Sequence, residues 1–157
     1  MPHHRHSTQI TAFNIRVYGI LINKRNEVLL SDEYEFGMKF TKFPGGGLKL
    51  GEGAIDCLKR ECIEELGQEI EIIGHYYTTD FFQPSAFHAD RQIISIYYRI
   101  RLASPARFRV SVKKFDFKNL REGAQSLRWV KIDKNLPDEV TFPIDKIVAK
   151  MIRKKYR

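Results

Sequence analysis

The spacing of hydrophobic and polar residues predicts a series of short β-strands. Segment 10–22 is rich in β-branched and aromatic residues, and a turn at 23–26 leads into a second apolar run at 27–31. Such a pattern predicts a β-hairpin. A short extended segment is expected next, at 39–43. The same composition predicts four further strands, at 69–82, 92–102, 107–112 and 127–132.

Two other segments have the spacing of amphipathic helices. In segment 54–66 the apolar residues fall on one helical stripe, which consists of Ile55, Leu58, Cys62 and Leu66. Gly67 is expected to end this helix, because glycine tolerates the left-handed conformation found there. A second helix is expected over 143–156, with Pro143 in its first turn. Strands with one central and one terminal helix predict an α/β fold, in which a mixed sheet is covered by helices on both faces.

The length of 157 residues suits a single domain. We expect segment 1–9, which is polar and rich in histidine, to be flexible, and residues 10–157 to form the domain. No apolar run is long enough for a membrane span, and the start lacks the apolar core of a secretory signal, so a cytoplasmic location is expected. Cys57 and Cys62 lie five residues apart on one predicted helix and cannot easily bridge, which suits a reducing compartment.

The chain is basic, with 27 lysines and arginines against 19 acidic residues and a formal charge of +8. This charge favours polyanionic partners such as nucleotides or nucleic acids through long-range attraction. An ordinary solvated basic surface has the same composition. Charge therefore does not select a function.

Three glutamates gather on the central helix. Glu61, Glu64 and Glu65 are spaced by three and four residues, so they fall within an arc of about 100°. Like charges at this spacing cost roughly a few tenths of a kcal/mol per pair, and Lys59 and Arg60 are expected to project away from them. A divalent cation, Mg²⁺ or else Mn²⁺, would balance the charge. Taken alone, three such glutamates more often form a solvated acidic face.

The surrounding residues complete a longer motif. A glycine is followed after five residues by a glutamate, and after seven more by Arg-Glu, Glu-Glu and Gly at fixed spacing. The fixed positions are filled by Gly46, Glu52, Arg60, Glu61, Glu64, Glu65 and Gly67. At about 7% usage per residue type, seven such matches arise by chance at on the order of 10⁻⁸ per starting position. This segment resembles the Nudix box, and the chain resembles the Nudix hydrolase family. Gln68 departs from the motif, because a polar residue stands where the box has an apolar one.

The resemblance implies a fold and a set of roles. The order of strands, box and terminal helix is similar to the α/β/α sandwich of the family. The implied metal ligands are the carboxylates of Glu61, Glu64 and Glu65 and the carbonyl of Gly46. Glu52 and Arg60 resemble the pair that braces the loop against the helix. The general base stays open between the box glutamates, Glu61 and Glu64 among them, and a distal one, for which Glu122 in the loop before Trp129 is the candidate; an ordinary exposed loop glutamate is the alternative.

The implied reaction is hydrolysis of a phosphoanhydride bond in a nucleotide derivative, because a dication screens the charge that repels an attacking water. We expect a nucleoside triphosphate or related small nucleotide as substrate and a nucleoside monophosphate as product. ADP-ribose or a nucleotide sugar is the second candidate. Phe82 could stack on a base, although its segment could also be core. Asp145 could contact a base edge, although an acid in a first helical turn has an ordinary explanation.

A function of another class stays open as well. The segments KKFDFK and MIRKKYR alternate basic and aromatic residues, as in proteins that bind nucleic acid. A pure binding protein would not need every box glutamate, so nucleic acid is the less favoured partner. The resemblance also implies a homodimer.

Overall fold

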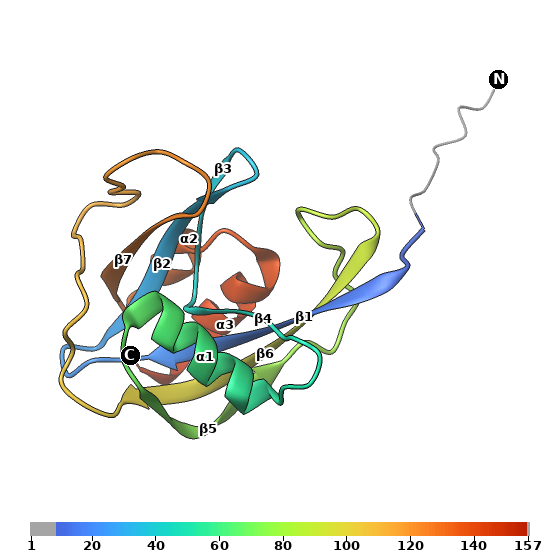
Figure 1. Cartoon of the computed structure of the whole chain (residues 1–157). Helices are drawn as coiled ribbons and strands as arrows, with labels where there is room; N and C mark the ends of the chain where they lie inside the picture. Colours follow the sequence, from blue (N-terminus) through green and yellow to red (C-terminus); the bar gives the residue numbers. More distant parts are fainter. Residues whose placement is uncertain (1–8, 157) are drawn as a thin grey trace.

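The computed structural model describes residues 9–156, so the segment 1–9 expected to be flexible lies outside it except for Gln9. Within these residues the chain forms seven strands and three helices (Figure 1). The strands are β1 (Ala12–Leu21), β2 (Glu27–Glu35), β3 (Met38–Lys42), β4 (Gly45–Gly47), β5 (Ile70–Thr78), β6 (Arg91–Leu102) and β7 (Ala124–Lys131). The helices are α1 (Ala54–Leu66), α2 (Leu136–Glu139) and α3 (Pro143–Lys155).

The strands form two sheets. One is a mixed sheet of order β4-β1-β6-β5, in which β1 and β6 run parallel and the outer pairs run antiparallel. The other is antiparallel, of order β3-β2-β7. In Figure 1, α1 lies in front of the mixed sheet and α3 lies behind it. The predicted α/β sandwich with a mixed sheet is confirmed.

Alternate residues of β1 and β2 face opposite helices, because successive side chains of a strand point to opposite sides. Val17 and Leu29 belong to the core cluster that contains the buried face of α1. Tyr18 and Leu30, the next residues along, belong to a second cluster that contains the buried face of α3. The two strands therefore separate two hydrophobic cores. The buried face of α1 packs against one side of β1.

The predicted helix 54–66 is confirmed, and it ends at Gly67, whose φ of 66° is left-handed. The predicted stripe is wrong at Ile55, which is 41% exposed. Cys57 takes the buried position instead. Both cysteines are buried, and both are free, as expected from their spacing. None of the helices between residues 9 and 156 is long and apolar enough to cross a membrane.

The predicted hairpin of segments 10–22 and 27–31 is wrong. β1 and β2 belong to different sheets and are joined only by the turn at 23–26 and one isolated bridge, Ile22 to Val28. The pattern of alternating residues identifies a strand but does not name its partner, and β1 pairs along its whole length with β6.

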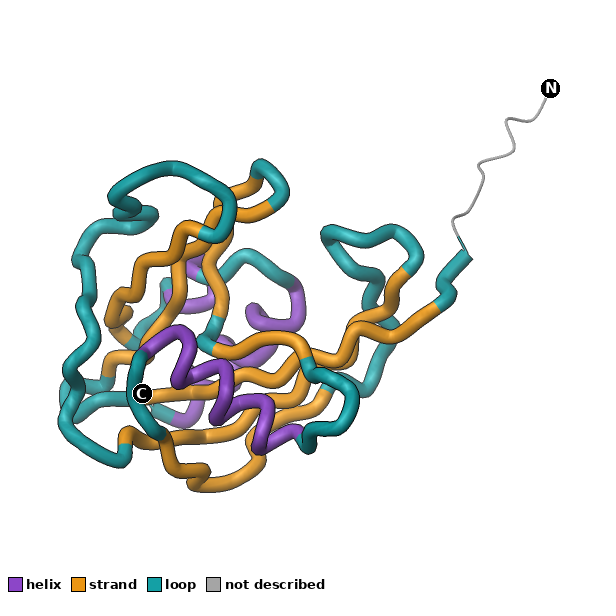
Figure 2. Tube along the Cα trace, in the orientation of Figure 1, coloured by secondary structure: helices purple, strands orange, loops and turns teal. Residues whose placement is uncertain are grey.

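The strand predicted at 107–112 is also wrong. This segment lies in a long loop between β6 and β7, which Figure 2 draws in teal at the left of the view. The amide of Ser111 donates to the carbonyl of Leu127 at 2.8 Å, but no ladder follows. Gln68, the polar residue in an apolar position of the box, explains in part why this segment forms a loop. It is buried, and its Oε1 accepts from the Arg107 amide at 2.6 Å while its Nε2 donates to the Pro105 carbonyl at 2.9 Å. The loop start is therefore bonded to the end of α1 instead of to a strand.

Candidate active site

The glycines of β4 let the backbone approach both β1 and α1. Gly45 has a φ of 137°, and a Cβ there would lie 2.1 Å from the carbonyl oxygen of Val17. At Gly46 a Cβ would lie 2.5 Å from the carboxylate carbon and Oε1 of Glu61. Any side chain at Gly46 would push the helix carboxylate away. Glycine at this position therefore keeps the β4 backbone against the acidic face of α1.

Arg60 lies at the centre of a charged network on this side of α1. Its Nε and Nη2 donate to the two carboxylate oxygens of Glu52 at 3.0 and 2.7 Å, and its Nη2 also donates to the Gly47 carbonyl at 3.1 Å. Its Nη1 lies 3.0 Å from Glu61 Oε1 and 3.4 Å from Glu64 Oε1. The hydrogen bonds from Arg60 lower the pKa of Glu52 to about 2. The expectation that Arg60 projects away from the glutamates is wrong, because its side chain is long enough to turn back along the helix.

This network joins three parts of the site. Glu52 lies in the loop before the helix, Arg60 on the helix and Gly47 on β4, so one guanidinium fixes their relative positions through bidentate geometry. The geometry is that expected of a pair that braces the loop against the helix. Glu64 is the loosest member, since its side chain is 54% exposed.

Glu65 faces a buried lysine that the sequence analysis missed. The Lys42 Nζ lies 2.9 Å from Glu33 Oε2 and 3.5 Å from Glu65 Oε1, and the Gly45 amide donates to Glu65 Oε2 at 3.1 Å. Burial raises the pKa of Glu65 to about 7, against the opposing effect of Lys42. Burial disfavours the charge of Lys42, but Glu33 and Glu65 raise its pKa above the usual value. No pattern around Lys42 in the sequence distinguishes it from an exposed strand lysine.

The donor chemistry of this face fits a hard dication. The carboxylates of Glu61, Glu64 and Glu65 come from one helix beside the backbone of β4, so this face offers carboxylate and carbonyl oxygens, the donors that Mg²⁺ prefers. Among residues 9–156 no three acidic, histidine or cysteine side chains converge on a common point. Arg60 and Lys42 hold the carboxylates instead, and they supply the positive charge that the sequence analysis expected from a metal alone.

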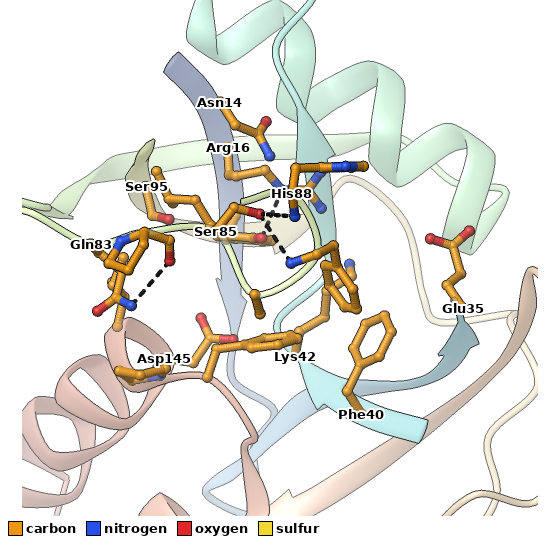
Figure 3. Close-up of a pocket in the computed structure, with 18 of the residues that line it drawn as sticks. Asn14, Arg16, Glu35, Phe40, Lys42, Gln83, Ser85, His88, Ser95 and Asp145 are labelled. Carbon is orange, nitrogen blue, oxygen red and sulfur yellow. Dashed lines mark hydrogen bonds between the residues drawn. The ribbon is translucent and has the colours of Figure 1, made fainter. Parts of the chain in front are cut away.

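A cavity of about 830 Å³, measured with its opening to solvent, lies next to Lys42. Figure 3 shows Arg16 from β1, Lys42 from β3, Asp145 from α3 and Ser85 from the segment before β6 around it. Four aromatic rings line another part of the cavity: Phe36, Phe40, Phe87 and Phe142. The Phe87 ring lies 5.1 Å from that of Phe36, 5.4 Å from that of Phe40 and 5.7 Å from that of Phe142. A lining that combines aromatic rings with a few charged and polar side chains is typical of a small-molecule site.

Two of the sequence-predicted substrate contacts fall in different places. Asp145 lines the cavity, where it is 2% exposed and accepts a hydrogen bond from the Tyr97 hydroxyl. Burial raises the pKa of Asp145 to about 6, although the hydrogen bond from Tyr97 opposes this. Phe82 is 59% exposed and is not part of the lining. Phe87, five residues later in the same aromatic segment, lies in the cavity wall instead.

Glu122 lies at the turn between β2 and β3. Its Oε2 accepts from the Phe36 amide at 2.7 Å and its Oε1 from the Gly37 amide at 3.0 Å. Within residues 9–156 it forms no ion pair or hydrogen bond with the box glutamates or with Arg60. In this conformation its carboxylate holds a loop, and the box glutamates form a group without it.

Comparison with known proteins decides the family. The model of the Nudix domain matches residues 12–151. The chain belongs to the Nudix family. Membership supports the predicted enzyme class, a Nudix-type pyrophosphohydrolase, and Nudix hydrolases generally use divalent metal ions. No curated protein matched the sequence.

Solved Nudix structures share the fold at low identity. A Nudix hydrolase from Nitrosomonas europaea is 17% identical, with a TM-score of 0.67 over 92% of this chain and 90% of its own. A structure from work on MutT of Aliivibrio salmonicida and Vibrio cholerae is 20% identical, with a TM-score of 0.58 over 92% and 99%. An ADP-ribose pyrophosphatase from Streptococcus suis is 14% identical, with a TM-score of 0.59 over 92% of each chain. Because their TM-scores are so similar, the fold does not choose among their activities.

Proposed function

We propose that the chain hydrolyses a phosphoanhydride bond in a nucleoside triphosphate or related small nucleotide with Mg²⁺, releasing a nucleoside monophosphate. The observation that carries the proposal is the position of Lys42. It lines the aromatic cavity and also pairs with Glu65 of the box helix. A nucleoside in the cavity would therefore place its phosphates at the glutamate face of α1.

In the proposed site Glu61, Glu64 and Glu65 would hold the ion together with the Gly46 carbonyl. A dication bound there supplies charge neutralisation at the diphosphate and acidifies a bound water. Arg60 keeps the helix and the glycine strand in register through Glu52 and Gly47. Lys42 adds a fixed positive charge between the cavity and the carboxylates, where the negative charge of the phosphates would lie.

The proposed proton acceptor within the box is Glu64. Its carboxylate is exposed, and its contacts with Arg60 Nη1, at 3.4 and 3.5 Å, are the longest that Arg60 makes with a carboxylate. Glu61 is held more firmly, at 3.0 Å from Arg60 and against Gly46. A base at this site must reach a water beside the ion and take its proton, and the weaker contacts of Glu64 with Arg60 favour Glu64 over Glu61.

Glu122 is the distal candidate for the same role, and its replacement separates the two. Because both of its oxygens hold the β2–β3 turn, Glu122→Gln should leave kcat within about threefold and lower thermal stability slightly, by about 1 kcal/mol. Steady-state kinetics and thermal unfolding of the one variant test this. A fall in kcat of about 100-fold or more, in the range that general bases contribute, with unchanged stability would make Glu122 the base.

A single screen tests the proposed function. The purified chain would be incubated with nucleoside triphosphates, ADP-ribose, nucleotide sugars and capped RNA, each with Mg²⁺, with Mn²⁺ and with a chelator. We expect a nucleoside monophosphate and pyrophosphate from a triphosphate, and no product with the chelator. Faster hydrolysis of ADP-ribose or a nucleotide sugar would replace the proposed substrate class. Metal-independent turnover would contradict the proposed site.

The cavity wall predicts which phenylalanine contacts the base. Phe87→Ala removes a ring from the aromatic lining, and should raise KM by about 5- to 150-fold, because stacking on one base is worth about 1–3 kcal/mol. Phe82→Ala is the matched control, since Phe82 is 59% exposed and outside the lining. Its KM should stay within about twofold, as for surface substitutions generally. A larger effect at Phe82 than at Phe87 would place the base elsewhere.

Family resemblance also predicts a homodimer. Light scattering of the purified chain should give twice the mass of 18.4 kDa. A mass of one chain over the working concentration range would correct this expectation.

A further inference from the structure

A second cavity of about 1060 Å³, again measured with its opening to solvent, lies beneath the loop between β6 and β7. Its walls come from this loop, from β7 and from the end of α1. Phe108 and Phe117 supply apolar surface, and Arg109, Lys118 and Arg121 supply positive charge. Glu65 lines it from the side of the box helix.

The loop that covers this cavity is fixed at several points. Besides the bonds from Gln68 at its start, the Phe115 amide donates to Asp32 Oδ2 at 3.1 Å. The Ser111 amide donates to the Leu127 carbonyl at 2.8 Å, and the Gly123 amide to the Tyr34 carbonyl at 2.9 Å. These bonds tie the loop to β2 and β7. Hydrogen bonds within the chain therefore hold the loop over this cavity.

In the part of the chain that the structure describes, the positive side chains of this cavity have no anionic partner. Arg109, Lys118 and Arg121 form no ion pair with any of residues 9–156, although the chain forms ten ion pairs elsewhere in that range. Asp116, the other acid in the lining, already accepts from the Ser111 hydroxyl at 2.9 Å. Three exposed cations that form no ion pair within residues 9–156 give this cavity a positive potential, which attracts an anion.

Glu65 connects this cavity to the proposed active site. It lines the second cavity and pairs with Lys42, which lines the first. A substrate whose phosphates lie at the box glutamates can therefore extend from the nucleoside cavity, past Glu65, towards the three cations. In the proposed reaction, the part of the substrate on the side of the three cations is the leaving group.

We propose that the second cavity binds the oligophosphate chain on the leaving side of the scissile bond, through Arg109 and Arg121. This inference rests on the proposed function for the assignment of the leaving side. A phosphate site in the second cavity would make a terminal phosphate chain the preferred leaving group, because a sugar beyond the second phosphorus would place a neutral group against these cations. Each charge-assisted hydrogen bond to phosphate that is lost should weaken binding by about tenfold or more.

Inorganic tripolyphosphate is the probe for this site. Its binding would be measured by isothermal titration calorimetry at low salt and with EDTA, so that no metal at the glutamates contributes. The variant Arg109→Gln/Arg121→Gln should weaken the affinity by about 100-fold or more. The control, Lys24→Gln/Arg25→Gln, removes the same charge from the exposed turn before β2, where neither side chain forms an ion pair with any of residues 9–156, and should leave the affinity within about twofold.

Kinetics of the same variants add a second comparison. The Arg109→Gln/Arg121→Gln variant should raise KM for nucleoside triphosphates and leave KM for nucleotide sugars unchanged. Equal tripolyphosphate affinity in the wild type and this variant, alongside normal triphosphate hydrolysis, would overturn the inference and leave the proposed function standing. Binding that depends on both arginines in a chain that hydrolyses no nucleotide would support the anion site and overturn the proposed function.

Discussion

Glu64→Gln should lower kcat by about 10²- to 10³-fold, or about 3–4 kcal/mol of transition-state stabilisation, while the protein stays folded. The substitution keeps the shape of the side chain and removes one negative charge from the proposed metal-binding face. Its structural cost is small, because the side chain is 54% exposed and its only ion pair within residues 9–156 is the 3.4 Å contact with Arg60. Such exposed pairs contribute at most about 0.5 kcal/mol.

Two further variants make this test specific. Glu69→Gln is the matched control, since Glu69 is an exposed glutamate just beyond the same helix and outside the motif, and its kcat should not change. Glu65→Gln should also lose activity, but with lower stability, because it removes a partner of the buried Lys42. Turnover would be measured with Mg²⁺, and Mn²⁺ binding by calorimetry. If Glu64→Gln kept both the turnover and the Mn²⁺ affinity of the wild type, the proposed metal site on this face would be contradicted.

The box is predictable because its residues are close in the sequence. Spacing on a helix decides which side chains share a face, so Glu61, Glu64 and Glu65 can be grouped from the sequence alone. The same is true of the helix end at Gly67, where local backbone chemistry decides the conformation. The prediction for Arg60 is wrong because a long side chain can turn back towards a neighbouring face.

The rest of the site depends on contacts between distant segments. Lys42 belongs to the site because Glu33 on the paired strand and Glu65 on α1 face it, and no local pattern records that meeting. Phe82 and Phe87 belong to the same irregular segment, but only Phe87 lines the cavity, and Phe82 is 59% exposed. β1 pairs along its whole length with β6, about eighty residues away, as the pairing of Ala12 with Arg91 shows. Such long-range pairing is chosen by packing, which period-two patterning does not specify.

The end of β2 illustrates the same limit. The predicted strand stops at 31, because the following residues are polar, but β2 continues to Glu35. Asp32 is fully buried there, and Arg128 on β7 is its partner, with Nε donating to Oδ2 at 2.8 Å and Nη2 to Oδ1 at 3.2 Å. The Thr41 hydroxyl and the Phe115 amide donate to the same carboxylate at 2.7 and 3.1 Å. One buried acid thus joins all three strands of the antiparallel sheet to the loop over the second cavity.

Asp32→Ala should therefore destabilise the protein by about 3–5 kcal/mol, the usual cost of leaving one member of a buried ion pair without its partner. Urea unfolding followed by tryptophan fluorescence would measure it, because Trp129 lies on β7. Glu139→Ala is the matched control: Glu139 also pairs with Arg128, at 3.0 Å, but its side chain is 33% exposed. Its removal should cost about 1 kcal/mol or less.

A double variant separates the buried charge from the packing. In Asp32→Leu/Arg128→Met both charges are replaced by apolar groups, so no buried cation is left without a partner, and part of the lost stability should return. The Phe115 amide would still lack its acceptor, so the loop over the second cavity should exchange its amide hydrogens faster than in the wild type. Equal stability of Asp32→Ala and Glu139→Ala would show that the buried pair contributes no more than an exposed one. The loop would then be held chiefly by its bonds to Gln68 and to the turn after β2.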